Sequence, residues 1–272
     1  MPRFSKQASL GETIALVQAL QIDLTGKVAV VTGGTRGLGR AVSAALAQAG
    51  CKVVACARST PEDLPDGVSF VSADIRDPDA ARALIDGVVA EHGRIDILVN
   101  NAGGSPASAA EAASPRFVDA ILKLNLVAPL YLAQAAHPHM VAAGGGSIVN
   151  IASVSGIRPS PGTAVYGAAK AGLLNLTQSL AQEWGPAAIR VNAIIAGLMS
   201  TETAEATYGD AEAQAAVGRS MPLQRMGTGE DIAGAVLWLC SPLASWVSGA
   251  RLNVDGGGER PYFLDLVKGA QS

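Results

Sequence analysis

The chain has 272 residues, a formal net charge of −3 and a hydrophobic content of 49%. So mild a charge, without any basic run, excludes the usual signature of proteins that bind nucleic acids or membrane surfaces. The length suffices for one large domain with a well-buried core, and we find no stretch that is long and apolar enough to cross a bilayer.

Residues 1–22 precede the regular pattern of the chain. Ser9 and Glu12 have the spacing of a helix capping box, and Leu10, Ile14 and Val17 follow on one helical face. We interpret residues 1–22 as an appended amphipathic helix rather than a targeting peptide.

From residue 27 onward, short β-branched runs alternate with alanine-rich stretches of helical period. The predicted strands are residues 28–31, 53–56, 69–72, 95–99, 147–151, 191–195 and 252–254. The clearest predicted helices are residues 39–48, 80–91, 165–184 and 230–239. Such alternation predicts an α/β protein, with a single doubly wound parallel sheet and helices on both faces. We expect one domain over residues 23–258 and a tail over residues 259–272.

The irregular stretch 198–226 follows the sixth predicted strand. Ligands bind at the carboxyl ends of parallel strands, so we expect this stretch to form a substrate lid. Leu198, Met199, Ala204, Ala206 and Tyr208 predict a largely apolar pocket beneath it, although such residues also serve ordinary helix packing.

Three cysteines, Cys51, Cys56 and Cys240, have neither a CxxC pattern nor the spacing of metal ligands. We therefore predict no metal site. An odd number of cysteines without a disulfide framework is typical of a reducing compartment, which favours a cytoplasmic location.

The first predicted strand leads into the glycine-rich turn 32–39, and a helix follows at once. Glycines at this position let backbone N–H groups and the helix amino terminus approach a pyrophosphate. The spacing is Gly33-x-x-x-Gly37-x-Gly39.

That turn resembles the cofactor turn of the short-chain dehydrogenase/reductase family, in its compact single-domain branch, to which 3-oxoacyl-carrier-protein reductases belong. Further motifs follow in order: Asp74 after the third strand, the run Asn100-Asn101-Ala102-Gly103, Tyr166-x-x-x-Lys170, and a closing strand that ends in Asp255-Gly256-Gly257. The resemblance covers roughly residues 22–258. It implies a Rossmann fold, an NAD(P)(H) cofactor and hydride transfer between a carbonyl group and an alcohol.

The resemblance also implies which residues contact the cofactor. They are Gly33, Thr35, Arg36, Gly37, Leu38, Gly39, Arg58, Asp74, Ile75, Asn101, Ala102, Gly103, Tyr166, Lys170, Gly197, Met199 and Thr201. Asp74 and Ile75 are expected at the adenine and Asn101 along the cofactor. Taken singly, Asp74 also fits a helix cap and Asn101 a turn.

The choice between NAD and NADP depends on charge at the end of the second strand, where an acidic residue binds the ribose hydroxyl and repels a 2′-phosphate. This chain has Ala57 there, with Arg58 next and Arg36 in the glycine turn. Two arginines favour NADP(H), with NAD(H) possible; the alternative is that both are ordinary solvated side chains.

Tyr166 and Lys170 are four residues apart on a predicted helix and therefore share a face. A nearby ammonium stabilises a phenolate, so we expect Lys170 to lower the pKa of Tyr166 from about 10 and make it a general acid/base. Ser153 is suited to stabilise the substrate oxygen. By resemblance, Lys170 also binds the nicotinamide ribose, and Asn125 holds a water in a proton relay to the lysine.

One departure from the family pattern follows the sixth strand, where the usual Pro-Gly is Ala196-Gly197. Loss of proline removes a φ constraint and is expected to loosen the lid. Thr201 is placed to touch the carboxamide, but the cap of a helix over residues 202–206 would explain it equally well.

Two other functions remain open: epimerisation or dehydration on the same fold, and a catalytically silent NADP-binding regulator. The first group of relatives generally carries a larger C-terminal substrate domain, and the second is disfavoured because all four catalytic positions are filled. A thioester, steroid, sugar or terpenoid substrate is compatible. Arg158 is expected to face solvent, with an anionic substrate group as the alternative.

By resemblance we expect a homotetramer, or a homodimer, built on the helices that carry Asn125 and Tyr166. Small residues on the second helix, Ala168, Ala169, Ala171 and Gly172, would permit close approach of a symmetry mate. The apolar cluster within residues 260–267 of the tail is expected to cover the active-site edge of a neighbouring subunit.

Overall fold

The structure is a computed structural model that describes residues 22–202 and 204–261. The appended helix predicted for residues 1–22 and most of the predicted tail lie outside the described residues.

Seven parallel strands form one sheet with the order β3-β2-β1-β4-β5-β6-β7. The strands are β1 (Val28–Thr32), β2 (Lys52–Ala57), β3 (Val68–Ser72), β4 (Ile97–Asn100), β5 (Gly146–Ser153), β6 (Ile189–Ala196) and β7 (Arg251–Val254). The predicted fold class is confirmed. The strand order reverses between β1 and β4, which places a ligand-binding crevice at the carboxyl ends of these strands.

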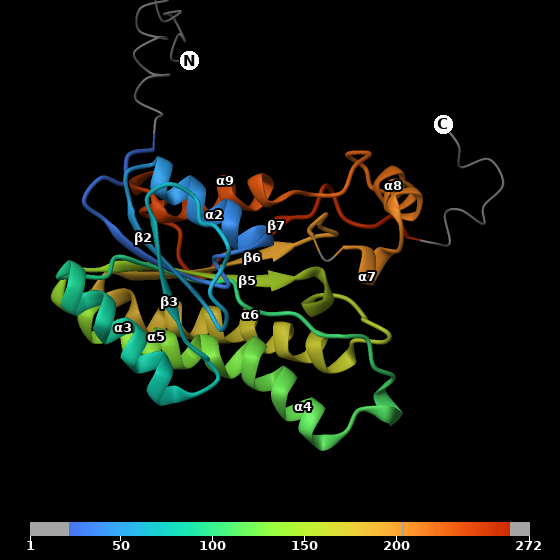
Figure 1. The fold of residues 1–272 in the computed structure, drawn as a ribbon, viewed down its shortest axis with the longest axis horizontal. Helices are drawn as coiled ribbons and strands as arrows, with labels where there is room; N and C mark the ends of the chain where they lie inside the picture. The colour runs from blue at the N-terminus through green and yellow to red at the C-terminus, as the bar shows by residue number, and fades with distance from the viewer. Residues whose placement is uncertain (1–21, 203, 262–272) are drawn as a thin grey trace, which may run out of the picture.

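Helices cover both faces of the sheet (Figure 1). One face carries α2 (Gly37–Gln48) and α9 (Gly229–Cys240), which pack on each other. The other carries α3 (Pro78–His92), α5 (Ala128–Ala142) and α6 (Ala164–Trp184). The remaining helical segments are α4 (Pro115–Leu122), η2 (Lys123–Val127), α7 (Glu205–Tyr208), α8 (Ala211–Ser220) and the short turns η1 (Ala110–Ala112), η3 (Val154–Gly156), η4 (Gly185–Ala187) and η5 (Pro242–Ala244).

The core has two layers because successive side chains of a strand point to opposite faces. In β1, Val28 and Val30 pack toward α3 and α5, whereas Ala29 and Val31 pack toward α2 and α9. Every residue of β1 is buried, as expected for a central strand of a sheet covered on both sides.

The expectation that no stretch is long and apolar enough to cross a bilayer is wrong for the helical stretch Pro115–Ala142. Within the described residues, its length and mean hydropathy of 1.3 match those of a bilayer-crossing helix, although we predicted no such stretch. The fold explains part of its apolar character, since Leu132, Ala136 and Met140 are fully buried against the sheet, although 33% of its most apolar 18 residues are buried in all. One or two such helices are weak evidence for a membrane span, because core helices have the same composition.

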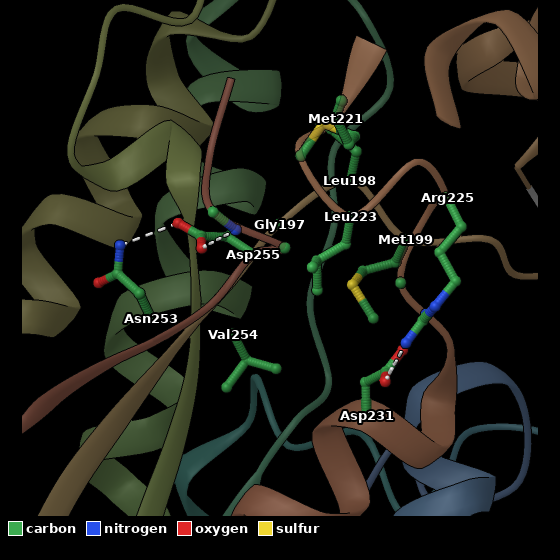
Figure 2. A pocket seen from close by; sticks show the side chains of 13 residues that line it. Gly197, Leu198, Met199, Met221, Leu223, Arg225, Asp231, Asn253, Val254 and Asp255 are labelled. Atoms are coloured by element: carbon green, nitrogen blue, oxygen red, sulfur yellow. Dashed lines mark hydrogen bonds and ion pairs between the residues drawn. The ribbon is translucent and has the colours of Figure 1, made fainter. Parts of the chain in front are cut away.

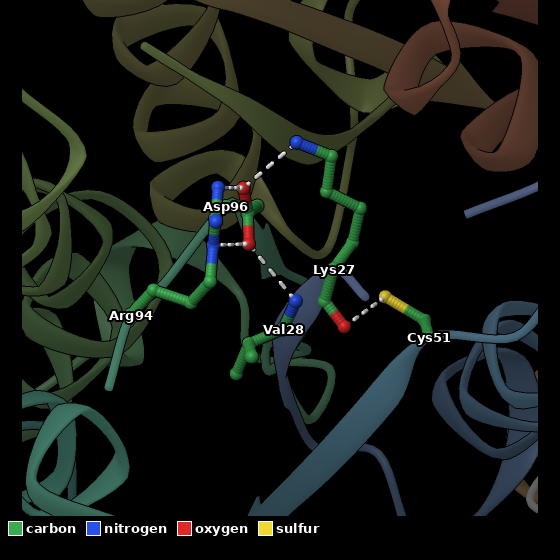
Figure 3. Close-up of polar contacts among 5 residues, drawn as sticks. All are labelled: Lys27, Val28, Cys51, Arg94 and Asp96. Carbon is green, nitrogen blue, oxygen red and sulfur yellow. Dashed lines mark hydrogen bonds and ion pairs between the residues drawn. The ribbon is translucent and has the colours of Figure 1, made fainter. Parts of the chain in front are cut away.

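The amino-terminal edge of the sheet is held by a buried carboxylate (Figure 3). Asp96 accepts two hydrogen bonds from Arg94, at 2.8 and 2.6 Å, one from Lys27 at 3.0 Å and one from the Val28 backbone at 3.0 Å. Burial alone would raise the pKa of Asp96, but these donors hold it below its ordinary value. The cluster ties β1 to β4 at the end opposite the crevice.

Candidate active site

The glycine-rich turn joins β1 to α2 at the carboxyl edge of the sheet. Gly33 and Gly37 have φ values of 63° and 52°, in the left-handed region that favours glycine. A Cβ on Gly39 would lie 2.1 Å from the Gly33 carbonyl oxygen, so only glycine lets the helix start so close to the turn. This backbone cradle fits the pyrophosphate of a dinucleotide at the amino terminus of α2.

Two polar side chains brace the turn against β4. The Thr32 hydroxyl accepts hydrogen bonds from the backbones of Asn101 and Ala102, both at 3.0 Å. The Asn101 amide donates to the carbonyls of Thr32 at 2.9 Å and Gly33 at 3.3 Å. Asn101 thus shapes the turn itself. Thr32 was not singled out from sequence, although its place as the first residue of the motif is a usable signal.

The basic residues near the crevice fall into two groups. Arg36 and Arg58 are exposed, and no ion pair engages either of them among the described residues. Arg40, by contrast, binds Asp63 at 2.6 Å, and Arg76 binds Asp74 at 2.5 Å. The two arginines predicted to meet a 2′-phosphate are therefore the ones without a direct ion-pair partner among the described residues, although Arg58 interacts electrostatically with Asp74 at longer range.

Asp74 and Ile75 follow β3, as expected. The Asp74 carboxylate is occupied by Arg76, chiefly through hydrogen bonds that lower the pKa of the carboxyl to about 2. The helix cap considered for Asp74 is in fact Asp77, which accepts from the Asp79 backbone at the start of α3. The side chain of Ile75 is buried in the core, which leaves its backbone for any contact with adenine.

The predicted catalytic serine and tyrosine meet where β5 ends and α6 begins. Ser153 is the last residue of β5, and its hydroxyl caps the following turn by accepting from the Ser155 backbone at 3.2 Å. The Ser153 side chain also interacts with Tyr166 and lowers its pKa, against the larger effect of burial. Two glycines allow this approach: a Cβ on Gly156 would lie 2.8 Å from the Lys170 backbone, and one on Gly167 would lie 2.8 Å from the Ser155 carbonyl.

The other two predicted catalytic residues, Lys170 and Asn125, are both buried. Lys170 is buried, donates to the Ile151 carbonyl at 2.8 Å and holds its ammonium 5.6 Å from the centre of the Tyr166 ring. Asn125 is fully buried in the π-helical segment η2, a local widening that is frequent at functional sites. Its amide bonds the backbone of Gly104 in both directions, at 2.9 and 3.0 Å. A Cβ on Gly103 would lie 2.7 Å from Asn125 Oδ1 and 3.1 Å from Lys170 Nζ, so all three groups share one small space.

The pKa of Tyr166 differs from the expectation. Burial raises it above its ordinary value, the bond with Ser153 opposes that effect, and the nearby Tyr208 adds to it. Burial likewise lowers the pKa of Lys170 to about 8. The predicted lowering at Tyr166 is wrong because desolvation is the larger effect, and because Lys170 lies against the ring and bonds a carbonyl.

The lid begins after β6, at Gly197. A Cβ on Gly197 would lie 2.6 Å from the Asp255 Cα, which explains the glycine without reference to a cofactor. Met199 is buried and its backbone bridges to Gly227 at the base of the lid. Thr201 approaches Gly37, but it caps no helix, since α7 starts at Glu205.

Glu202, which sequence analysis missed, accepts a hydrogen bond from the Gly37 backbone at 3.1 Å. A carboxylate thus lies at the amino terminus of α2, where anions are stabilised. No local pattern around Glu202 indicates this contact.

A cavity of about 280 Å³ lies between the lid and the end of β7 (Figure 2). Met199, Met221 and Leu223 converge on it between the Arg225–Asp231 ion pair and the Asn253–Asp255 contact. Its lining includes the predicted cofactor residues Gly197 and Met199 but none of the four predicted catalytic residues.

A doubly wound sheet, a glycine cradle at the switch in strand order and the half-buried Tyr166 beside the buried Lys170 together define a dinucleotide-binding α/β protein. Comparison with known families refines that class. The family model described as "Enoyl-(Acyl carrier protein) reductase" matches residues 33–259.

Curated relatives agree over nearly their whole lengths. The 2-dehydro-3-deoxy-D-gluconate 5-dehydrogenase of Escherichia coli is 38% identical over 86% of this chain and 96% of its own. The 3-oxoacyl-[acyl-carrier-protein] reductase of Chlamydia muridarum is 36% identical over 86% of this chain and 98% of its own.

Solved structures give the same result. The aldohexose dehydrogenase of Thermoplasma acidophilum has a TM-score of 0.82 at 32% identity, covering 87% of this chain and 95% of its own. A short-chain alcohol dehydrogenase described from Sinorhizobium meliloti has a TM-score of 0.80 at 34% identity, covering 87% and 97%. The chain belongs to the short-chain dehydrogenase/reductase family and is an oxidoreductase of that family.

Proposed function

We propose that this protein transfers a hydride between NADP(H) and a carbonyl or secondary alcohol substrate, with Tyr166 as the general acid/base. The observation that carries the proposal is the convergence of Ser153, Tyr166, Lys170 and Asn125 at the carboxyl edge of the sheet, beside the glycine cradle. The related proteins above are named dehydrogenases and reductases, whereas nothing favours an epimerase or a silent regulator.

Each of the four side chains has a separate role in the proposed reduction. Ser153 donates to the substrate oxygen as negative charge develops, and Tyr166 delivers the proton. Burial raises the pKa of Tyr166, which keeps the phenol protonated and suits it to act as the acid. Lys170 then supplies the compensating proton, and Asn125 holds the Gly103–Gly104 backbone around the lysine. When bound, the nicotinamide cofactor supplies or accepts the hydride.

The preference for NADP(H) over NAD(H) rests on Arg36 and Arg58. Both lie at the cofactor end of the crevice without an ion pair among the described residues, and no acidic residue follows β2 directly. A 2′-phosphate is therefore the group that these charges fit best. The proposed cofactor contacts are those given above from sequence, with Ile75 acting through its backbone.

The direct test incubates the purified protein with NADPH or NADH and a panel of ketones, aldehydes and 3-oxoacyl thioesters, and follows absorbance at the nicotinamide band. We expect substrate-dependent oxidation of NADPH at a higher kcat/KM than of NADH. Tight NADPH binding without turnover of any carbonyl or alcohol would instead identify a binding protein.

We further propose a homotetramer in a reducing compartment such as the cytoplasm. Of the most apolar 18 residues within Pro115–Ala142, only 33% are buried within the subunit. Ala168 and Ala171 are also exposed on α6, so both helices have surface that a second subunit could cover. The other small residues of α6 serve the subunit itself, since Ala169 is buried and Gly172 leaves room for Leu126. All three cysteines are buried and free.

A further inference from the structure

Most of the lid residues that suggested an apolar substrate pocket pack into the protein's own hydrophobic core. Met199 and Ala204 are 7% and 3% exposed, and Met199 packs in the cluster beneath α2 and α9. Leu198 packs against the buried residues between β5, β6 and α6. Of the five residues named from sequence, Ala206 is exposed, and Leu198 and Tyr208 are partly exposed.

Tyr208 interacts electrostatically both with Tyr166 and with the charged residues Arg158 and Glu259. Tyr208 is partly buried, and the Met199 backbone acts on its phenol against the larger effect of burial, which raises its pKa. It is also close enough to Tyr166 to raise the pKa of that residue. Glu259 and Arg158 also act on the pKa of Tyr208: Glu259 raises it and Arg158 lowers it.

The two charged residues follow the carboxyl ends of two different strands, β5 and β7. Arg158 lies five residues after Ser153, where its backbone N–H bonds the Val154 carbonyl at 3.1 Å and ends the turn η3. Glu259 follows the glycine-rich turn after β7. Arg158 Nη2 donates to Glu259 Oε1 at 2.6 Å, Arg158 Nε is paired with Oε2, and each side chain is 36% exposed. The pair is therefore partly accessible: Arg158 faces solvent in part, as expected, but it is also ion-paired with Glu259, which the sequence did not indicate.

We propose that Arg158, Glu259 and Tyr208 form the specificity-determining rim of the catalytic site. We further propose that the substrate is a small, neutral, polyhydroxylated secondary alcohol, including the anomeric alcohol of a cyclic sugar, or the corresponding carbonyl compound. This inference rests on the proposed function. Adjacent hydroxyl groups accept from the guanidinium and donate to the carboxylate without separating the two charges. A hydrocarbon substrate would cover the pair without replacing its hydration, which is unfavourable. A carboxylate substrate would have to displace Glu259 from Arg158.

The test compares kcat/KM for oxidation of neutral aldohexoses, a hexuronate and cyclohexanol, in the wild type and in Arg158→Gln and Glu259→Gln. We expect the best aldohexose to exceed both other substrates. In each variant its KM should rise about tenfold, the effect of one lost charge-assisted hydrogen bond, with kcat less affected and cyclohexanol unchanged. Asp86→Asn, which breaks the distant His139–Asp86 pair, serves as the control and should change none of these values.

Two results would overturn the inference while the proposed function stands: cyclohexanol or the hexuronate as the best substrate, or an aldohexose KM that neither variant changes. Binding of NADPH without turnover of any member of either panel would contradict the proposed function and the inference together. Circular dichroism of both variants confirms that a raised KM does not reflect unfolding.

Discussion

The two edges of the sheet bury charged groups in opposite ways. At the amino-terminal edge, Asp96 has four hydrogen-bond donors, and they hold the pKa of its carboxyl below the ordinary value despite burial. At the carboxyl edge, Lys170 bonds one carbonyl, and burial lowers its pKa to about 8. A buried charge with a full set of partners stabilises the fold, whereas titratable groups with few partners are poised to exchange protons.

The largest effect is expected at the carboxyl edge, in Tyr166→Phe. Removal of the hydroxyl eliminates the proton donor, so kcat should fall by about 100- to 10,000-fold. Binding of NADPH, measured by fluorescence titration, should remain nearly unchanged because the ring and Lys170 are retained. Substantial turnover in this variant would refute the role of Tyr166.

At the amino-terminal edge, Asp96→Asn should act on stability rather than chemistry. It removes the charge shared by Arg94 and Lys27, and we expect a loss of about 1–3 kcal/mol in the free energy of unfolding, because both cations are partly exposed and water solvates them once the carboxylate is gone. Urea denaturation measures this loss, with Asp86→Asn as an exposed control that should change stability by less than about 1 kcal/mol. Equal effects in the two variants would contradict the structural role of the cluster.

The same cluster predicts a pH dependence. The pKa of Asp96 is lower in the folded protein than its unfolded value of about 4. Its contribution is therefore complete above pH of about 4 and is lost as the pH falls through the folded pKa. The wild type should lose stability in that acid range more steeply than Asp96→Asn, as followed by thermal unfolding between pH 2 and 6.

A smaller effect is expected from Arg58→Ala in the cofactor end of the crevice. One charge-assisted contact with a 2′-phosphate corresponds to about ten- to a hundredfold in affinity. The dissociation constant for NADPH should rise by that factor while that for NADH changes little. An equal loss for both cofactors would argue against NADP(H) as the preferred cofactor.

The smallest expected effect is that of Glu202→Gln. The carboxylate that bonds the Gly37 backbone places a negative charge beside the cradle for the pyrophosphate. Its removal should tighten NADPH binding by about two- to fivefold, the usual size of one charge at a helix terminus. Calorimetric titration decides the sign: weaker binding would mean that the Glu202–Gly37 bond instead holds the lid closed over the cofactor.

The sequence by itself determined the alternation of strands and helices, and hence the parallel sheet, because period and β-branching reflect burial locally. It also located the glycine turn and the Tyr–Lys spacing, since both depend on residues a few positions apart. The predicted catalytic residues Ser153 and Tyr166 are indeed adjacent in the fold, and Asn125 and Lys170 share the space beside Gly103.

Properties that depend on contacts between residues far apart in the sequence were decided only by the tertiary structure. The direction of the pKa shift of Tyr166 depends on its desolvation in the folded chain. The burial of Met199 depends on a core cluster whose residues come from distant parts of the sequence. The pairing of Arg158 with Glu259 joins residues 101 positions apart. The sequence predicted the crevice, because the motifs that form it are local. It did not predict the polar rim, because desolvation and charge pairing depend on distances in the folded chain.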